Sequence, residues 1–149
     1  MSSIVVRNGT IINEGKSFRG DILISDDIIT AIGNIDYETI PQDAVTVNAS
    51  GMFVMPGIID CHVHFREPGL THKADIFTES RAAAAGGITS FMDMPNTVPP
   101  ATTLNILNDK FKIAAEKSLI NYSFYLGGTN SNIDQIMEAD PETVCGLKL

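Results

Sequence analysis

The chain has 149 residues, of which 44% are hydrophobic and 19% charged, and its formal net charge is −8. This length and apolar content suit a folded domain with a buried core. An acidic chain repels phosphate backbones and anionic lipid, so we expect neither nucleic acid nor a membrane as partner. Its two cysteines, Cys61 and Cys145, are too few for a disulfide framework and favour a cytoplasmic protein.

The first fifty residues predict β structure. Two apolar runs flank Asn8-Gly9, a pair typical of a hairpin turn, and Ser25-Asp26-Asp27 indicates a second turn. Residues 44–51 predict a further short strand. We therefore expect residues 1–52 to form a small antiparallel sheet or part of a β-sandwich.

From residue 53 the pattern changes to strands alternating with helices. Apolar runs predict strands buried on both faces, and amphipathic or alanine-rich segments predict helices between them. The strands lie within 52–65, 88–95, 120–128 and 143–149, and the helices within 73–87, 103–118 and 132–140. Alternation of this kind indicates parallel βαβ units, so the fold class is α/β.

Four such units are half of a (β/α)8 barrel, which needs roughly 250 residues. The final residues, Val144 to Leu149, have the composition of the middle of a buried strand. We therefore expect residues 53–149 to be the first four β/α units of a barrel within a longer protein.

The first of these strands ends in a His-x-His pair. Because side chains alternate along a strand, His62 and His64 are expected on one face, at the barrel end where such enzymes place their chemistry. Neutral imidazole is a good ligand for zinc and similar ions. Asp60 shares the predicted face and could orient a histidine or contact the metal. The spacing alone is equally compatible with two ordinary histidines.

Three further side chains have both an ordinary and a functional interpretation. Arg66 is either a solvated loop residue or a bidentate partner for a substrate carboxylate, and Asn96 is either a turn residue or a second donor to that carboxylate. Lys148, within an apolar strand, either reaches solvent or pairs with an acidic side chain, or it is carboxylated on Nζ as an anionic metal ligand.

Three segments carry a family resemblance: "MPGIIDCHVHFREPG", "RAAAAGGITSFMDMPNTVPP" and "CGLKL". They resemble the dihydroorotases, which belong to the cyclic amidohydrolase group. The resemblance implies a metal-dependent (β/α)8 barrel beside a small β-sandwich built from both chain ends. It also implies reversible interconversion of N-carbamoyl-L-aspartate and L-dihydroorotate in de novo pyrimidine biosynthesis, by a metal-activated hydroxide.

The same resemblance suggests roles for individual residues. His62 and His64 would bind the more buried of two zinc or similar divalent ions, and Lys148 would occupy the position of a carboxylated bridging lysine. Arg66 and Asn96 would hold the substrate carboxylate. The catalytic aspartate is expected beyond Leu149, His72 has no assigned role, and a homo-oligomer is compatible with the family.

Two other interpretations stay open. The chain could belong to an allantoinase or a hydantoinase/dihydropyrimidinase, although the arginine after His-x-His-Phe and the Pro-Asn-Thr signature favour a dihydroorotase. It could also belong to a non-catalytic relative that keeps the barrel as a scaffold, although intact His62, His64 and Arg66 argue against this.

Overall fold

The computed structural model describes residues 2–149, which divide after Pro56 into two compact units. The predicted boundary after residue 52 differs from this division. The short strand β5 (Phe53–Val54) pairs with the first strand of the chain, so the N-terminal unit extends through it. No helix among the described residues is long and apolar enough to cross a membrane.

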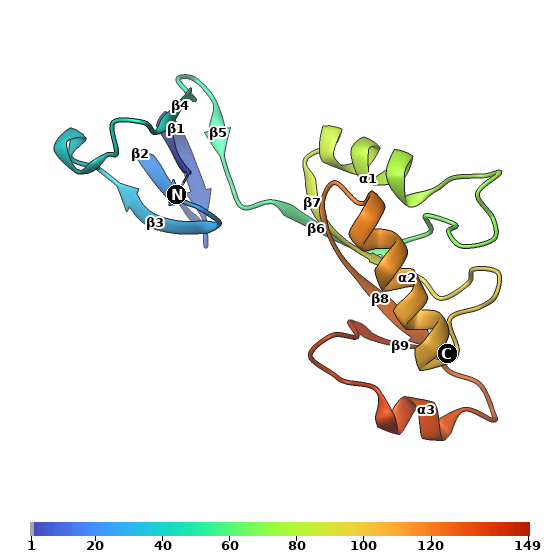
Figure 1. Ribbon diagram of the computed structural model, residues 1–149. Helices are drawn as coiled ribbons and strands as arrows, with labels where there is room; N and C mark the ends of the chain where they lie inside the picture. Colours follow the sequence, from blue (N-terminus) through green and yellow to red (C-terminus); the bar gives the residue numbers. More distant parts are fainter. Residues whose placement is uncertain (1) are drawn as a thin grey trace. The chain divides into compact units, whose positions relative to one another are not determined.

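The N-terminal unit is a single mixed sheet (Figure 1). Strands β1 (Ser3–Asn13), β2 (Lys16–Ser25) and β3 (Ile28–Gly33) are antiparallel, while β4 (Val45–Asn48) and β5 pair with β1 in parallel. A 3-10 turn, η1 (Tyr37–Thr39), connects β3 to β4. Val5, Leu23 and Ile35 form the small core.

The hairpin predicted at Asn8-Gly9 is wrong. β1 runs through this pair as a bulge, with a left-handed φ of 63° at Asn8, and the turn to β2 lies at Glu14-Gly15. Gly9 serves close packing instead, because a Cβ there would come within 2.6 Å of Val54 Cγ2. The turn predicted at Asp26-Asp27 is confirmed between β2 and β3.

The C-terminal unit has the predicted alternation of strands and helices. Its four parallel strands are β6 (Ile58–Val63), β7 (Ile88–Asp93), β8 (Asn121–Gly127) and β9 (Gly146–Lys148), in the order β6-β7-β8-β9. The connecting helices are α1 (Ile76–Ala85), α2 (Leu104–Lys117) and α3 (Ile133–Glu138). This is the half-barrel arrangement expected from the sequence (Figure 1).

The main core of this unit lies between the sheet and its helices. Phe91 on β7 and Phe124 on β8 are almost completely buried against Leu107 and Ala114 of α2. The predicted burial of the first strand on both faces does not hold in the described residues, since Ile58 and Ile59 of β6 are exposed. β6 is an edge strand of this four-stranded sheet and pairs only with β7.

Candidate metal and substrate site

The two predicted metal ligands lie together at the carboxyl end of β6. The ring centroids of His62 and His64 are 5.2 Å apart, with the rings tilted by 59°, and both residues are exposed. A register shift between Asp60 and Val63 interrupts the regular alternation of side chains just before His64. The imidazole pair therefore depends on an irregular strand end as well as on the His-x-His spacing.

Asn96 contacts a histidine, a contact that the sequence did not predict. Its side-chain oxygen Oδ1 lies 2.8 Å from Nδ1 of His64. Since an amide oxygen can only accept, Nδ1 of His64 carries the hydrogen and donates it. In the neutral imidazole the other ring nitrogen, Nε2, then presents a lone pair, which is the arrangement of a metal-binding histidine oriented by a second residue. The donor set at this strand end thus fits a divalent ion such as zinc.

Asp60 has a different partner. Its Oδ1 accepts the backbone N–H of His62 at 3.1 Å, so the carboxylate supports the backbone at the first histidine. A role for Asp60 as a metal ligand or as a partner of a ring stays a prediction.

Arg66 combines an unusual backbone with a free side chain. Its φ of 68° lies in the left-handed region, which non-glycine residues rarely adopt and which is often found at functional sites. Its carbonyl accepts the N–H of Leu70 at 3.0 Å, which closes a turn. Arg66 as a residue is half-buried, and its guanidinium makes no hydrogen bond or ion pair with any residue of the described range 2–149. It is available for an anionic ligand.

Lys148 lies on β9, where it pairs in register with Gly127. Its side chain is exposed, and it takes part in no ion pair among residues 2–149. The described part of the chain holds no cluster of three or more His, Cys, Asp or Glu side chains that could bind a metal. The two imidazoles therefore provide only part of a coordination shell, and a bridging role for Lys148 stays a prediction.

A buried ion pair that the sequence did not predict lies below these loops. Nζ of Lys110 on α2 is 2.8 Å from Oδ2 of Asp93 at the end of β7. Burial lowers the pKa of Lys110, and the charge of Asp93 opposes that effect. One feature of the sequence could have indicated this pair. Lys110 lies three residues after Leu107, on the apolar face of the predicted helix, where a charge needs a buried partner.

Glu67 also stabilises the loop that follows β6. Its buried carboxylate accepts the N–H of Ile76 at 3.0 Å and forms an ion pair with Lys117. The pKa of Lys117 is raised, mainly by its hydrogen bond to Glu67. One side chain thus connects the loop after Arg66 to the start of α1 and the end of α2.

On the strands themselves, Tyr125 of β8 reaches β6. Its hydroxyl donates to the carbonyl of Cys61, next to His62, at 3.0 Å. Burial raises the pKa of Tyr125, so the phenol stays protonated and remains a donor at neutral pH. Cys61 and Cys145 are both free thiols.

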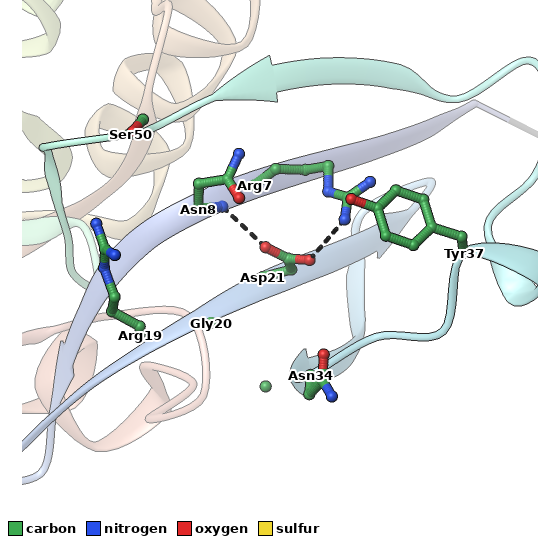
Figure 2. A pocket seen from close by; sticks show the side chains of 9 residues that line it. Arg7, Asn8, Arg19, Gly20, Asp21, Asn34, Tyr37 and Ser50 are labelled. Atoms are coloured by element: carbon green, nitrogen blue, oxygen red, sulfur yellow. Dashed lines mark hydrogen bonds and ion pairs between the residues drawn. The ribbon is translucent and has the colours of Figure 1, made fainter.

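A pocket with a volume of about 450 Å³ lies elsewhere, within the N-terminal unit (Figure 2). Arg7 is held there by Asp21, at 3.3 Å, and stacks on the ring of Tyr37. Asp21 also accepts the backbone N–H of Asn8 at the bulge of β1. None of the predicted site residues lines this pocket. The contacts of Asp21 with Arg7 and with the bulge of β1 explain why its side chains are fixed. We therefore place the candidate site at the end of β6.

Comparison with known proteins identifies the family. A model described as "Amidohydrolase family" matches residues 53–145. The chain belongs to the amidohydrolase family. It is 40% identical over 138 residues to a dihydroorotase of Methanosarcina acetivorans, covering 93% of this chain and 29% of that protein. It is 39% identical over 147 residues to an allantoinase of Desulfitobacterium hafniense, covering 97% of this chain and 32% of that protein.

Solved amidohydrolase structures give the same result for the fold. The L-hydantoinase (dihydropyrimidinase) from Arthrobacter aurescens superposes with a TM-score of 0.90 at 32% identity, covering 99% of this chain and 32% of that chain. This amidohydrolase chain spans about a third of the length of the relatives that it matches.

Proposed function

We propose that the protein is a metal-dependent cyclic amidohydrolase that interconverts N-carbamoyl-L-aspartate and L-dihydroorotate. The observation that carries the proposal is Arg66, a half-buried residue two positions after His64 in a left-handed turn, whose guanidinium has no partner in the described range 2–149. A guanidinium fork matches the geometry of a carboxylate, which dihydroorotate carries on its ring. Dihydroorotases among the relatives support the same substrate.

His62 and His64 would hold a divalent ion, with Nε2 of His64 directed by the contact of Nδ1 with Asn96. Lys148, if carboxylated, would add an anionic oxygen ligand. When bound, such an ion supplies Lewis-acid polarisation of the amide carbonyl and activation of water near neutral pH. The coordinating nitrogen of each histidine must carry no proton, so a proton and the metal ion compete for it.

The other residues bind and orient the substrate. The fork of Arg66 would accept the substrate carboxylate and fix the ring against the histidine end of β6. Asn96 uses Oδ1 for His64, which leaves its Nδ2 free to donate to the same carboxylate. One amide could thus orient a metal ligand and the substrate together.

A second candidate is an allantoinase or hydantoinase activity. It is supported by the similarity to allantoinases and by the close superposition on an L-hydantoinase. Hydantoins lack the ring carboxylate of dihydroorotate, so the two candidates differ in what Arg66 has to bind.

The test is an assay of the full-length protein after removal and return of zinc, with the variant His62→Ala for comparison. We expect zinc to restore hydrolysis of L-dihydroorotate in the wild type, and His62→Ala to bind less metal and to be inactive while still folded. Wild-type metal content and turnover in His62→Ala would refute the assignment of the metal ligands.

A further inference from the structure

The most deeply buried charges of the described chain belong to one ion pair, Asp93 and Lys110. Their side chains are 1% and 0% exposed, and Oδ2 of Asp93 lies 2.8 Å from Nζ of Lys110. Nζ also lies 4.7 Å from the centroid of the Phe124 ring, so the ammonium is enclosed by apolar surroundings. Neither residue takes part in the proposed chemistry.

Each charge also contacts the backbone of a different loop. The second oxygen of Asp93, Oδ1, accepts the N–H of Phe65 at 2.9 Å, and Phe65 stands between His64 and Arg66. Nζ of Lys110 donates to the carbonyl of Met94 at 3.0 Å, two residues before Asn96. The pair therefore connects the loop after β6 to the loop after β7, and the His64–Asn96 contact joins the same two loops above it.

Fold stability alone gives this pair little justification. Replacing a buried ion pair by apolar residues of similar volume is often neutral or stabilising, because the charges no longer have to be desolvated. Lys110 also lies on the apolar face of α2, between Leu107 and Ala114, where an apolar side chain would fit the helix pattern. Its contacts with the two loops of the candidate site offer a better reason for its presence than fold stability does.

We infer that Asp93 and Lys110 are positioning residues, which hold the loop of His64 and Arg66 in register with the loop of Asn96. The inference rests on the proposed function for the part played by these three side chains. Asp93 fixes the backbone at Phe65 and Lys110 fixes it at Met94. The buried pair thus adds to the backbone bonds from Met94 N–H to Val63 and from Val98 N–H to Pro68, which join the same two loops.

The test uses the double variant Asp93→Leu/Lys110→Met in the full-length protein, because removing both charges leaves no unpaired buried ion. Lys112→Met is the matched control: Lys112 lies on the same helix, is 75% exposed and pairs only with Asp109. We expect the double variant to melt somewhat below the wild type, because the Phe65 N–H and the Met94 carbonyl lose their buried partners. At temperatures where it is fully folded, it should lose about 10- to 100-fold in kcat on L-dihydroorotate, and the control should change neither property.

Amide hydrogen exchange in the metal-free protein gives a readout independent of activity. The Phe65 amide should exchange at least about tenfold faster in the double variant, because it loses a buried acceptor. A second variant, Asp93→Asn/Lys110→Met, keeps an acceptor for Phe65 and should restore protection there. Wild-type exchange at Phe65 in Asp93→Leu/Lys110→Met, or activity lost only in proportion to stability, would overturn the inference.

The two proposals fail in different ways. If the wild type does not turn over L-dihydroorotate, the proposed function is wrong, while the exchange of Phe65 still decides whether the pair holds the loops. If turnover is normal and exchange is unchanged in the double variant, only the positioning role is wrong.

Discussion

Asn96 makes the most informative single substitution, because its two side-chain atoms are expected to do different things. Oδ1 accepts from Nδ1 of His64 at 2.8 Å, whereas Nδ2 is free for a substrate. Sequence reasoning gave Asn96 a role only toward the substrate, which would leave metal binding untouched on substitution. The observed contact leads to a different expectation, namely that Asn96→Ala weakens both metal binding and substrate binding.

The magnitude follows from the contact that is lost. A neutral hydrogen bond contributes about 0.5–1.5 kcal/mol, and loss of a residue that orients a ligand histidine typically costs about 10- to 100-fold in metal affinity. Because the pair is exposed, we expect a value near the lower end, roughly tenfold, for Asn96→Ala. Arg66 makes no hydrogen bond to either imidazole in the described residues, so Arg66→Lys should bind metal as the wild type does.

The assay is a competitive titration of zinc against a chromogenic chelator, using metal-free full-length protein. Asn96→Ala should show the weaker affinity and Arg66→Lys the wild-type value, while both should lose activity on L-dihydroorotate. Equal zinc affinity in Asn96→Ala and the wild type would show that the contact does not orient His64 for a metal.

Three further predictions concern stability of the full-length protein. Gly69→Ala should destabilise by at least about 2 kcal/mol in denaturant unfolding, because Gly69 has a φ of 80° and a Cβ would collide with the carbonyl of Val98; wild-type stability would contradict this. Asp75→Ala should cost about 1 kcal/mol at neutral pH, since Asp75 caps α1. Its pKa is lowered, mainly by the backbone N–H of Thr78, so the difference should vanish on acidification below the usual pKa of 3.8 and not on making the solution alkaline. The ion pair of Lys117 should respond to alkaline instead of acidic conditions. Because the pKa of Lys117 is raised, the stability lost in Lys117→Met should be constant from neutral pH up to about 10.5 and shrink above it, and a difference that persists at higher pH would argue against the pair.

The parts of the fold that follow hydrophobic periodicity could be predicted from the sequence. The strands and helices of the C-terminal unit lie where apolar runs and amphipathic segments indicated, because burial between a sheet and its helices determines both patterns. The Asn8-Gly9 pair misled the prediction for β1. The left-handed residue Asn8 lies in a β-bulge and not in a turn. A bulge is distinguished from a turn here only by the strand pairing on either side, Val6 with Ile22 and Gly9 with Gly20.

The members of the candidate site could be proposed from the sequence, whereas their contacts could not. His62, His64 and Arg66 are proposed from their local spacing, which needs no knowledge of long-range packing. The contacts of Asn96 with His64 and of Asp93 with Lys110 join residues 32 and 17 positions apart, and no local pattern specifies them. Lys110 on an apolar helix face was the one available sign of a buried partner.

The most direct measurement of the central claim compares L-dihydroorotate with 5,6-dihydrouracil, which has the same ring without the carboxylate. For the wild-type full-length protein kcat/KM should strongly favour L-dihydroorotate, and Arg66→Lys should remove most of that preference while leaving hydrolysis of dihydrouracil unchanged. The loss should be about 10-fold or more, since charged hydrogen bonds contribute about 1.5–3 kcal/mol. A wild type that prefers dihydrouracil, allantoin or a hydantoin, or an Arg66→Lys variant that loses activity equally on both rings, would contradict the claim.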